Sequence, residues 1–182
     1  MLNIILIQFG LNKKIRPVNR LDRDTTGIVI FAKNEYIQDY LAKQMKLGLF
    51  YKEYLAVLEG FLKSKKGTIN APIARKENSI IERCINENGC PAITDYEVIK
   101  EFNNFSLVKF ILKTGKTHQI RVHSKHIGHS ILGDTLYGAS SNLINRQALH
   151  CYKINFIHPI TKENINLVAP LPEDINYIIK KK

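Results

Sequence analysis

The sequence predicts an α+β fold, in which a mixed, mainly antiparallel central sheet is flanked by a few helices and loops. Two observations favour it. Apolar and polar residues alternate in several segments that turn residues join as hairpins. Few segments show the caps and spacing of helices. Because 182 residues can bury a core without disulfides, we expect residues 1–182 to form a single domain.

The first part of the chain predicts a strand, a helix and a second strand. Residues 27–33 form a short apolar run, which we expect to be a strand buried on both faces. Asn34 can cap a helix over residues 35–46, and Gly48 can end it. Residues 50–58 combine aromatic and apolar side chains that suit a half-buried strand.

A hairpin is the clearest feature of the middle of the chain. Residues 92–100 alternate between two faces, residues 105–113 form a partner run, and two asparagines join them. Residues 68–73 predict a weaker strand, which Pro72 restricts to a sheet edge or a strand end. Residues 76–91 are polar and predict a hairpin loop.

The last third predicts a helix, two strands and a terminal basic helix. Thr117 can cap the first helix, which runs to about His126, and Gly128 can end it. A loop over residues 134–142 follows. Residues 147–158 and 165–169 predict two strands, and residues 172–182 predict a basic helix. Strands that follow one another through short turns pair antiparallel.

The charge of the chain favours nucleic acid as a partner. Lysine and arginine number 27 against 16 acidic residues, so the formal net charge is +11. Such a field attracts polyanions, and each neutralised phosphate adds salt-sensitive affinity. No apolar run approaches the ~20 residues that cross a bilayer. Residues 1–9 lack the basic start and cleavage site of a signal peptide, so we expect no membrane association.

Cysteine and histidine spacing gives little support for a disulfide or a metal site. Cys84, Cys90 and Cys151 are odd in number and form no Cys-x-x-Cys motif, so reduced thiols in a cytoplasmic protein are the simplest interpretation. A Cys84–Cys90 bridge stays open. His123 and His126 share a helix face, but no acidic or cysteine ligand stands at motif spacing, and we expect no metal.

Two stretches near the start carry candidate chemical groups. Asp22 stands between Arg20 and Arg23, whose charges favour an ionised carboxylate that can act as a nucleophile or a base. Taken alone, such a spacing is more often an exposed salt-bridged loop. Tyr54, on a predicted strand, can lay its ring against a base, although strand tyrosines are more commonly core residues.

Two later stretches add cationic and hydrogen-bonding groups. Residues 114–123 open with a glycine turn whose free backbone N–H groups suit a phosphate. Arg121 in this stretch can reach back to a carboxylate such as Asp22. Residues 129–138 form a loop that can close one side of a site. The donors predicted beside the glycine turn are Lys116, His118 and Gln119.

Together, these motifs resemble the RluA-type pseudouridine synthase family. The matching segments are Arg20-Leu21-Asp22-x-x-Thr25-x-Gly27, Lys52-x-Tyr54, Thr114 to His123, Gly128-His129-x-Ile131-x-Gly133-Asp134-x-x-Tyr137-Gly138, Leu149-His150 and Phe156-x-His158-Pro159. Their order and spacing agree from about Arg16 to Pro170. The resemblance implies a pseudouridine synthase-like fold and a cofactor-free isomerisation of uridine to pseudouridine in structured ribosomal or transfer RNA.

The resemblance also implies roles for individual residues. Asp22 would act as nucleophile or base while the glycosidic bond breaks, and Arg121 would keep it ionised and aimed. Tyr54 would stack on the uracil and help to remove the C5 proton, while Arg20 would support the flipped-out nucleotide. The further RNA contacts that we expect are Arg23, Lys116, His118 and Gln119. The sequence leaves the oligomeric state open.

The sequence departs from the family pattern in three places. Asn19 stands where a histidine commonly precedes Arg-Leu-Asp, and Lys116 stands where arginine is common. Only 19 residues precede Arg20, without a Lys-Pro-x-Gly segment, so we expect a catalytic domain that lacks its first strands and any S4-type domain. A catalytically silent RNA-binding module is therefore the alternative function. A nuclease or N-glycosylase that uses Asp22 is a third.

Overall fold

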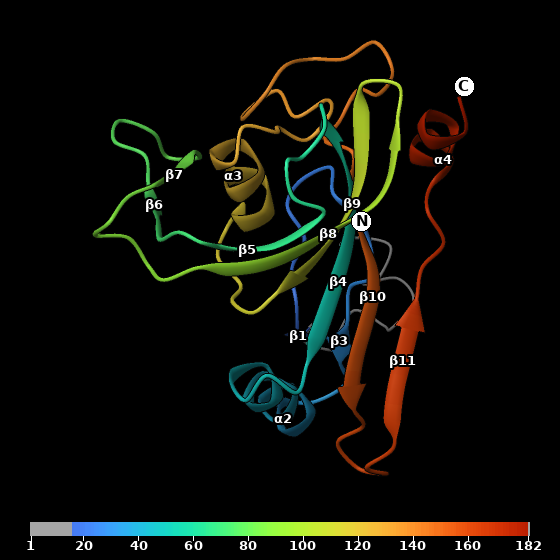
Figure 1. Ribbon diagram of the computed structural model, residues 1–182. Coiled ribbons are helices and arrows are strands. Elements are labelled where there is room, and N and C mark those ends of the chain that lie inside the picture. The colour runs from blue at the N-terminus through green and yellow to red at the C-terminus, as the bar shows by residue number, and fades with distance from the viewer. Residues whose placement is uncertain (1–15, 182) are drawn as a thin grey trace.

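The computed structural model describes residues 16–181 and confirms the predicted α+β architecture (Figure 1). The central sheet contains β2 (Thr26–Gly27), β4 (Tyr51–Glu59), β5 (Lys66–Asn70), β8 (Ile93–Phe102), β9 (Phe105–Leu112), β10 (Leu149–Ile157) and β11 (Asn164–Val168). Two small sheets pair β1 (Arg16–Pro17) with β3 (Phe31–Ala32) and β6 (Ile73–Arg75) with β7 (Arg83–Ile85). The helices are α2 (Glu35–Lys46), α3 (Gln119–His126) and α4 (Glu173–Lys180).

The central sheet runs in the order β11-β10-β4-β9-β8-β5, and β2 pairs with β10 beside this path. The strands along the path are antiparallel neighbours, whereas β2 and β10 are parallel. The hairpin expected from residues 92–113 is β8 and β9. The strand expected over residues 68–73 is β5 at the edge of the sheet, but it ends at Asn70, before Pro72, and Ile73 belongs to β6. The prediction about residues 1–9 lies outside the described part of the chain.

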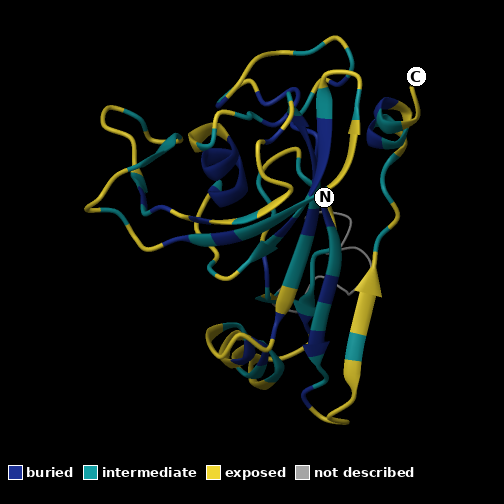
Figure 2. Ribbon diagram, viewed as in Figure 1, coloured by how far each residue is buried: buried dark blue, intermediate teal, exposed yellow. Residues whose placement is uncertain are grey.

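The core lies along the middle strands of the sheet. The apolar residues of β4, β9 and β10 that have no exposed surface are Ala56, Val57, Leu58, Val108, Phe110, Cys151 and Ile154. Figure 2 shows buried residues concentrated there, while β11 is largely exposed at one edge. Fully burying a large apolar side chain contributes about 1.5–3 kcal/mol. These strands therefore provide the rigid support for the loops at their ends.

Helix α2 forms where its capping residues predict it. The Asn34 side chain accepts a hydrogen bond from the Ile37 N–H at 2.9 Å, and Gly48 follows the helix with φ = 71°. In Figure 1, α2 lies beside the start of β4, and α4 lies near the tip of the β8–β9 hairpin. Asn103 in that tip donates to the Lys181 carbonyl at 3.3 Å. Within residues 16–181, no helix is long and apolar enough to cross a bilayer.

The cap predicted for α3 is wrong. The N-cap is His118, in a left-handed conformation with φ = 57°, and it makes no side-chain cap bond, so Thr117 lies outside the helix. The side chain of Gln119 instead binds the turn before the helix, because its carbonyl oxygen accepts a hydrogen bond from the Lys116 N–H at 2.9 Å. Gly128, with φ = 83°, follows the helix as expected.

The strand predicted over residues 27–33 is wrong in length and burial. Its ends belong to β2 and β3, and the three residues between them, Ile28 to Ile30, are only half-buried. The Ile28 N–H donates to the Cys151 carbonyl at 3.1 Å, and the Ile30 carbonyl accepts from the Val18 N–H at 2.9 Å. This apolar run therefore links the central sheet to the small β1–β3 sheet. Residues 76–91 also differ, because β7 lies inside the predicted loop.

A charged cluster across β5, β8 and β9 makes part of the stability sensitive to acid. Glu97 accepts hydrogen bonds from Lys109 and Lys66, at 2.5 and 2.7 Å, and these lysines lower the pKa of Glu97 to about 2 from 4.5. A carboxylate with a depressed pKa stabilises the fold above its unfolded pKa and loses this contribution as the pH falls. We expect Glu97→Gln to lower the urea midpoint at pH 6 and to lower it less at pH 3. An equal decrease at both pH values would contradict this assignment.

Candidate active site

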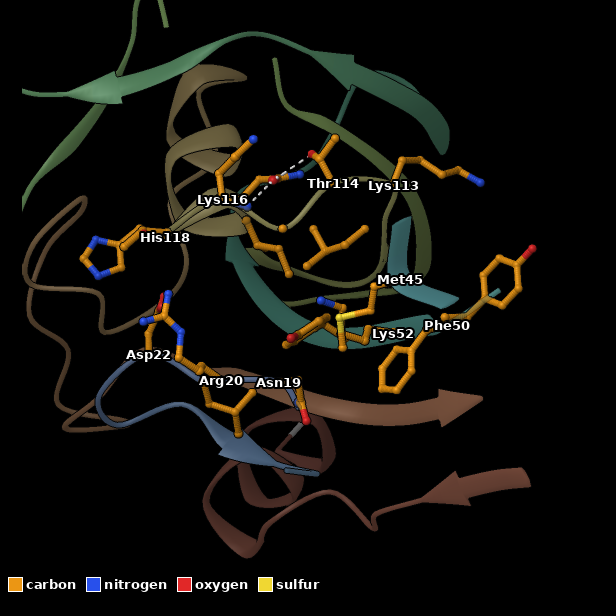
Figure 3. A pocket seen from close by; sticks show the side chains of 18 of the residues that line it. Asn19, Arg20, Asp22, Met45, Phe50, Lys52, Lys113, Thr114, Lys116 and His118 are labelled. Carbon is orange, nitrogen blue, oxygen red and sulfur yellow. Dashed lines mark hydrogen bonds between the residues drawn. The ribbon is translucent and has the colours of Figure 1, made fainter. Parts of the chain in front are cut away.

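A cleft of about 1090 Å³ lies between the loop before β2, the end of α2, the start of β4 and the turn before α3 (Figure 3). The predicted site residues that line it are Arg20, Asp22, Tyr54, Lys116, His118 and Gln119. These residues come from three separate stretches of sequence, so the fold brings together most of the predicted site.

Asp22 occupies a tight turn at the edge of the cleft. The Thr25 N–H donates to the Asp22 backbone carbonyl at 3.1 Å, and Asp24 adopts a left-handed φ of 68°. The Asp22 side chain is 24% exposed, against 51% for Asp24. A partly buried carboxylate beside a cleft can reach a bound molecule while water still has limited access.

The segment that leads into β10 holds this turn from behind. The Gln147 amide donates to the Arg23 carbonyl and, at 3.0 Å, to the Thr25 hydroxyl. Arg146 donates to the Asp24 carbonyl at 3.3 Å. The sequence did not predict Arg146 or Gln147 as site residues. The backbone groups that they bind lie more than 120 positions away, and no local pattern reports such a contact.

Gly27 lets the chain that follows the turn approach β10 closely. Its φ is 116°, and a Cβ atom there would lie 2.3 Å from the Cys151 carbonyl oxygen. Because that neighbour is backbone, a side chain at this position would separate β2 from β10. Glycine is therefore needed for the parallel pairing that fixes the Asp22 turn.

Arg121 is held mainly by a carboxylate that is not the predicted one. Its Nε and Nη2 atoms donate to both oxygens of Asp134, at 2.7 and 2.8 Å, whereas its Nη1 atom lies 3.7 Å from Asp22 Oδ2. The Asp134 carboxylate is fully buried. Such bidentate pairs fix the plane of the guanidinium group. Asp134 therefore orients Arg121, and the remaining nitrogen of Arg121 faces Asp22.

Tyr137 and His118 complete this cluster. The Arg121 guanidinium lies 5.0 Å from the centre of the Tyr137 ring, and the Tyr137 hydroxyl lies 2.8 Å from His118 Nδ1. Burial lowers the pKa of His118, although the nearby Asp22 carboxylate opposes that shift. The imidazole is therefore biased towards its neutral form, in which it can accept or donate one hydrogen bond at each nitrogen.

Tyr54 projects from β4 and is only 6% exposed. Burial raises the pKa of its phenol well above the usual value of 10, and the neighbouring Cys151 and Asp22 add to this effect. The hydroxyl therefore stays protonated near neutral pH and can donate a hydrogen bond. The predicted stacking on the uracil and the predicted help in removing the C5 proton both stay predictions.

The side-chain amide of Gln119 is fully used within the protein. Its oxygen accepts from the Thr114 hydroxyl and the Lys116 N–H, both at 2.9 Å. Its nitrogen donates to the Ile93 carbonyl at 3.0 Å and the Thr94 hydroxyl at 2.8 Å. Gln119 thus braces the turn before α3, and this geometry argues against the RNA contact predicted for it.

The cleft does not include every predicted RNA-binding residue. The Arg23 side chain is 95% exposed, pairs with Asp24 at 3.2 Å and lies outside the cleft lining. Its RNA contact stays a prediction. His123, one of the two helix histidines, is buried and bonds to the Thr94 hydroxyl and the Ala71 carbonyl. Within residues 16–181, no group of three or more potential ligand side chains could hold a metal ion.

The amino-acid sequence matches the model of a known protein family. That family is described as RNA pseudouridylate synthase, and the match covers residues 2–126. The chain belongs to the RNA pseudouridylate synthase family. This membership confirms the resemblance drawn from the motifs around Asp22, Tyr54 and Arg121.

Relatives of this family cover nearly the whole chain. A protein of Bacillus subtilis named uncharacterized RNA pseudouridine synthase is 43% identical over 94% of this chain and 60% of its own length. The ribosomal large subunit pseudouridine synthase D of Blochmanniella floridana is 36% identical over 98% of this chain and 62% of its own. The chain thus spans about three fifths of the length of these synthases.

The fold is also that of solved pseudouridylate synthases. The structure of human RNA pseudouridylate synthase domain containing 1 has a TM-score of 0.77, with 24% identity over 97% of this chain and 82% of its own. That of domain containing 4 has a TM-score of 0.76, with 20% identity over 96% and 78%. The predicted pseudouridine synthase-like architecture is therefore confirmed.

Sequence reasoning missed Asp134 as the main partner of Arg121. A signal was present, because Asp134 and Tyr137 stand three residues apart in the glycine-flanked stretch Gly133-Asp134-x-x-Tyr137-Gly138. The Asp134 carboxylate also accepts from the backbone N–H of Tyr137 at 3.2 Å. A carboxylate that closes such a turn is well placed to hold a cation on a neighbouring helix of the synthase fold.

Proposed function

We propose that this chain is the catalytic domain of an RNA pseudouridine synthase, in which Asp22 acts as nucleophile or base. One observation carries the proposal: the Asp22 carboxylate lines a cleft, 3.7 Å from an arginine that a buried carboxylate holds in place. The guanidinium group of Arg121 thus faces the Asp22 carboxylate as a counter-charge at the edge of the cleft. Family membership supports the same activity.

The proposed isomerisation needs no added atom. The N1–C1′ bond of uridine breaks, the uracil turns, and a C5–C1′ bond forms. One proton leaves C5 and one is taken up at N1, so the reaction balances without a cofactor. Asp22 assists the glycosidic bond cleavage, Tyr54 stacks on the uracil, and Arg20 at the exposed edge of the cleft supports the flipped-out nucleotide.

Structured RNA is the substrate class that we infer, with ribosomal RNA first and transfer RNA second. The net charge of +11 supports a polyanionic partner. The name of the Blochmanniella relative refers to the large ribosomal subunit, which supports ribosomal RNA. All three cysteines carry free thiols, as in proteins of a reducing compartment, and a cytoplasmic location belongs to this proposal.

The proposal is tested by incubating the chain with cellular RNA from a strain in which its gene is deleted. We expect pseudouridine to return at specific uridines, detected by chemical mapping of the modified base. Salt-sensitive RNA binding without pseudouridine would contradict the proposal and favour a silent RNA-binding module. Strand cleavage or abasic sites would favour a nuclease or N-glycosylase instead.

A further inference from the structure

The cleft continues beyond the Asp22 centre to the turn between α2 and β4. In Figure 3, Phe50 and Lys113 lie at the opposite end of the cleft from Asp22 and His118. Lys113, which directly follows β9, lines the same end of the cleft. The residues that line the far end are Met45, Lys46, Leu47, Phe50, Tyr51 and Lys113.

The cleft is larger than one nucleotide requires. Its volume of about 1090 Å³ exceeds the range of roughly 300–1,000 Å³ in which pockets enclose a drug-sized ligand. A uridine nucleotide belongs to that size class. When the target uridine occupies the Asp22 end, the far end therefore remains open to a connected part of the same RNA.

The far end combines exposed apolar surface with unpaired cations. Tyr51 is 47% exposed and Leu47 is 73% exposed, although both lie beside a cleft. Among residues 16–181, Lys46 at this end makes no ion pair, and neither does Lys52 next to it, whereas Lys113 pairs with Asp95 at 3.2 Å. An aromatic face beside free ammonium groups is the surface that binds single-stranded nucleic acid.

Lys52 lies between the two ends of the cleft (Figure 3). It is partly buried, and burial lowers the pKa of its ammonium group. A phosphate beside Lys52 would provide its ammonium group with a counter-charge, which no side chain of residues 16–181 supplies. A second copy of this chain is a poor occupant, because two molecules of charge +11 repel each other.

We propose that the far end of the cleft is a subsite for the nucleotide next to the target uridine. Tyr51 stacks on the base of that nucleotide, and Lys46 and Lys52 bind its phosphates. The inference rests on the proposed function, because it takes the Asp22 end as the uridine site. It assigns to the α2–β4 turn a part in choosing which uridine is modified, since stacking strength depends on the neighbouring base.

Fluorescence of the flanking base tests the stacking. The probe is a synthetic RNA hairpin with one loop uridine and 2-aminopurine on its 5′ or its 3′ side. We expect the full chain to quench the emission in one of the two probes. Tyr51→Ala should abolish the quenching and raise Kd about tenfold, within the ~5- to 150-fold range of base–aromatic stacking. Tyr51→Phe should retain both.

Tyr36→Ala is the matched control, since Tyr36 is a 63% exposed tyrosine of α2 outside the cleft lining. It should behave as the wild type. Equal behaviour of Tyr51→Ala and Tyr36→Ala would overturn the subsite. The subsite would also be overturned if Tyr51→Ala kept its RNA affinity but lost self-association, measured by sedimentation without RNA.

The salt dependence of binding tests the phosphate contacts. Lys46→Gln should reduce the slope of log Kd against log salt by ~0.7, the value for one phosphate contact with a single strand. Lys43→Gln is the control, because Lys43 lies in the same helix but pairs with Asp39 at 2.7 Å. Equal slopes for the two variants would overturn the assignment of Lys46.

These binding measurements do not require catalysis. If the chain forms pseudouridine but Tyr51→Ala matches its control, the subsite is wrong and the proposed function stands. If no pseudouridine forms but the quenching depends on Tyr51, the proposed function is wrong and the RNA-binding surface stands.

Discussion

Asp22→Asn is expected to lower kcat by at least ~100-fold, the lower end of what a positioned acid or base contributes. The amide keeps the size of the side chain but can neither ionise nor act as a nucleophile at neutral pH. Arg121 also loses its charge partner at 3.7 Å. RNA affinity should stay close to that of the wild type, because the substitution removes a negative charge and no phosphate contact.

Tritium release from RNA labelled at C5 of uridine measures this effect, since the C5 proton leaves during isomerisation. Asp24→Asn is the matched control: it changes an exposed carboxylate two residues away, and asparagine tolerates the φ of 68° found there. We expect that control to keep most of the activity. Equal rates for the two variants would exclude Asp22 as the catalytic group.

Asp134→Asn is expected to lower the free energy of unfolding by about 3–5 kcal/mol, as for a buried ion pair that loses one partner. The carboxylate is fully buried and binds both Nε and Nη2 of Arg121. Without it, the guanidinium group loses its nearest counter-charge and its fixed plane, and only Asp22 remains, at 3.7 Å. Urea unfolding at pH 7 measures the loss.

The same variant separates positioning from stability. Asp134 lies outside the cleft lining, so we expect kcat to fall in the folded fraction while KM stays nearly constant. Asp39→Asn breaks an exposed pair with Lys43 and should leave both the urea midpoint and kcat close to those of the wild type. If Asp134→Asn showed the same stability and the same kcat as Asp39→Asn, the role given to Asp134 would be wrong.

Local signals predicted the elements whose determinants are local. The helix α2 follows from Asn34 and Gly48, and the β8–β9 hairpin follows from alternation around an asparagine turn. The apolar run from Ile28 to Ile30 was mispredicted, because its hydrogen bonds go to distant segments. No periodicity over a few residues reports such partners.

The same distinction applies to the site. Motif order was enough to place Asp22 and Tyr54 beside one cleft. It did not reveal that Arg121 binds mainly to Asp134, because the choice between two carboxylates depends on how α3 packs against the following loop. Nor did it reveal that Gln119 uses its amide for internal bonds, since an exposed and a buried glutamine look alike in sequence.

The attachment of the Asp22 turn to the chain around β10 has a consequence for the order of assembly during synthesis. Gln147 contacts a carbonyl 124 positions earlier in the sequence. At translation rates of about 5–20 residues per second, that partner is made roughly 6–25 s after the turn itself. The catalytic turn is thus translated early and completed late, and a nascent chain stalled before Gln147 would carry Asp22 without the contacts that shape it.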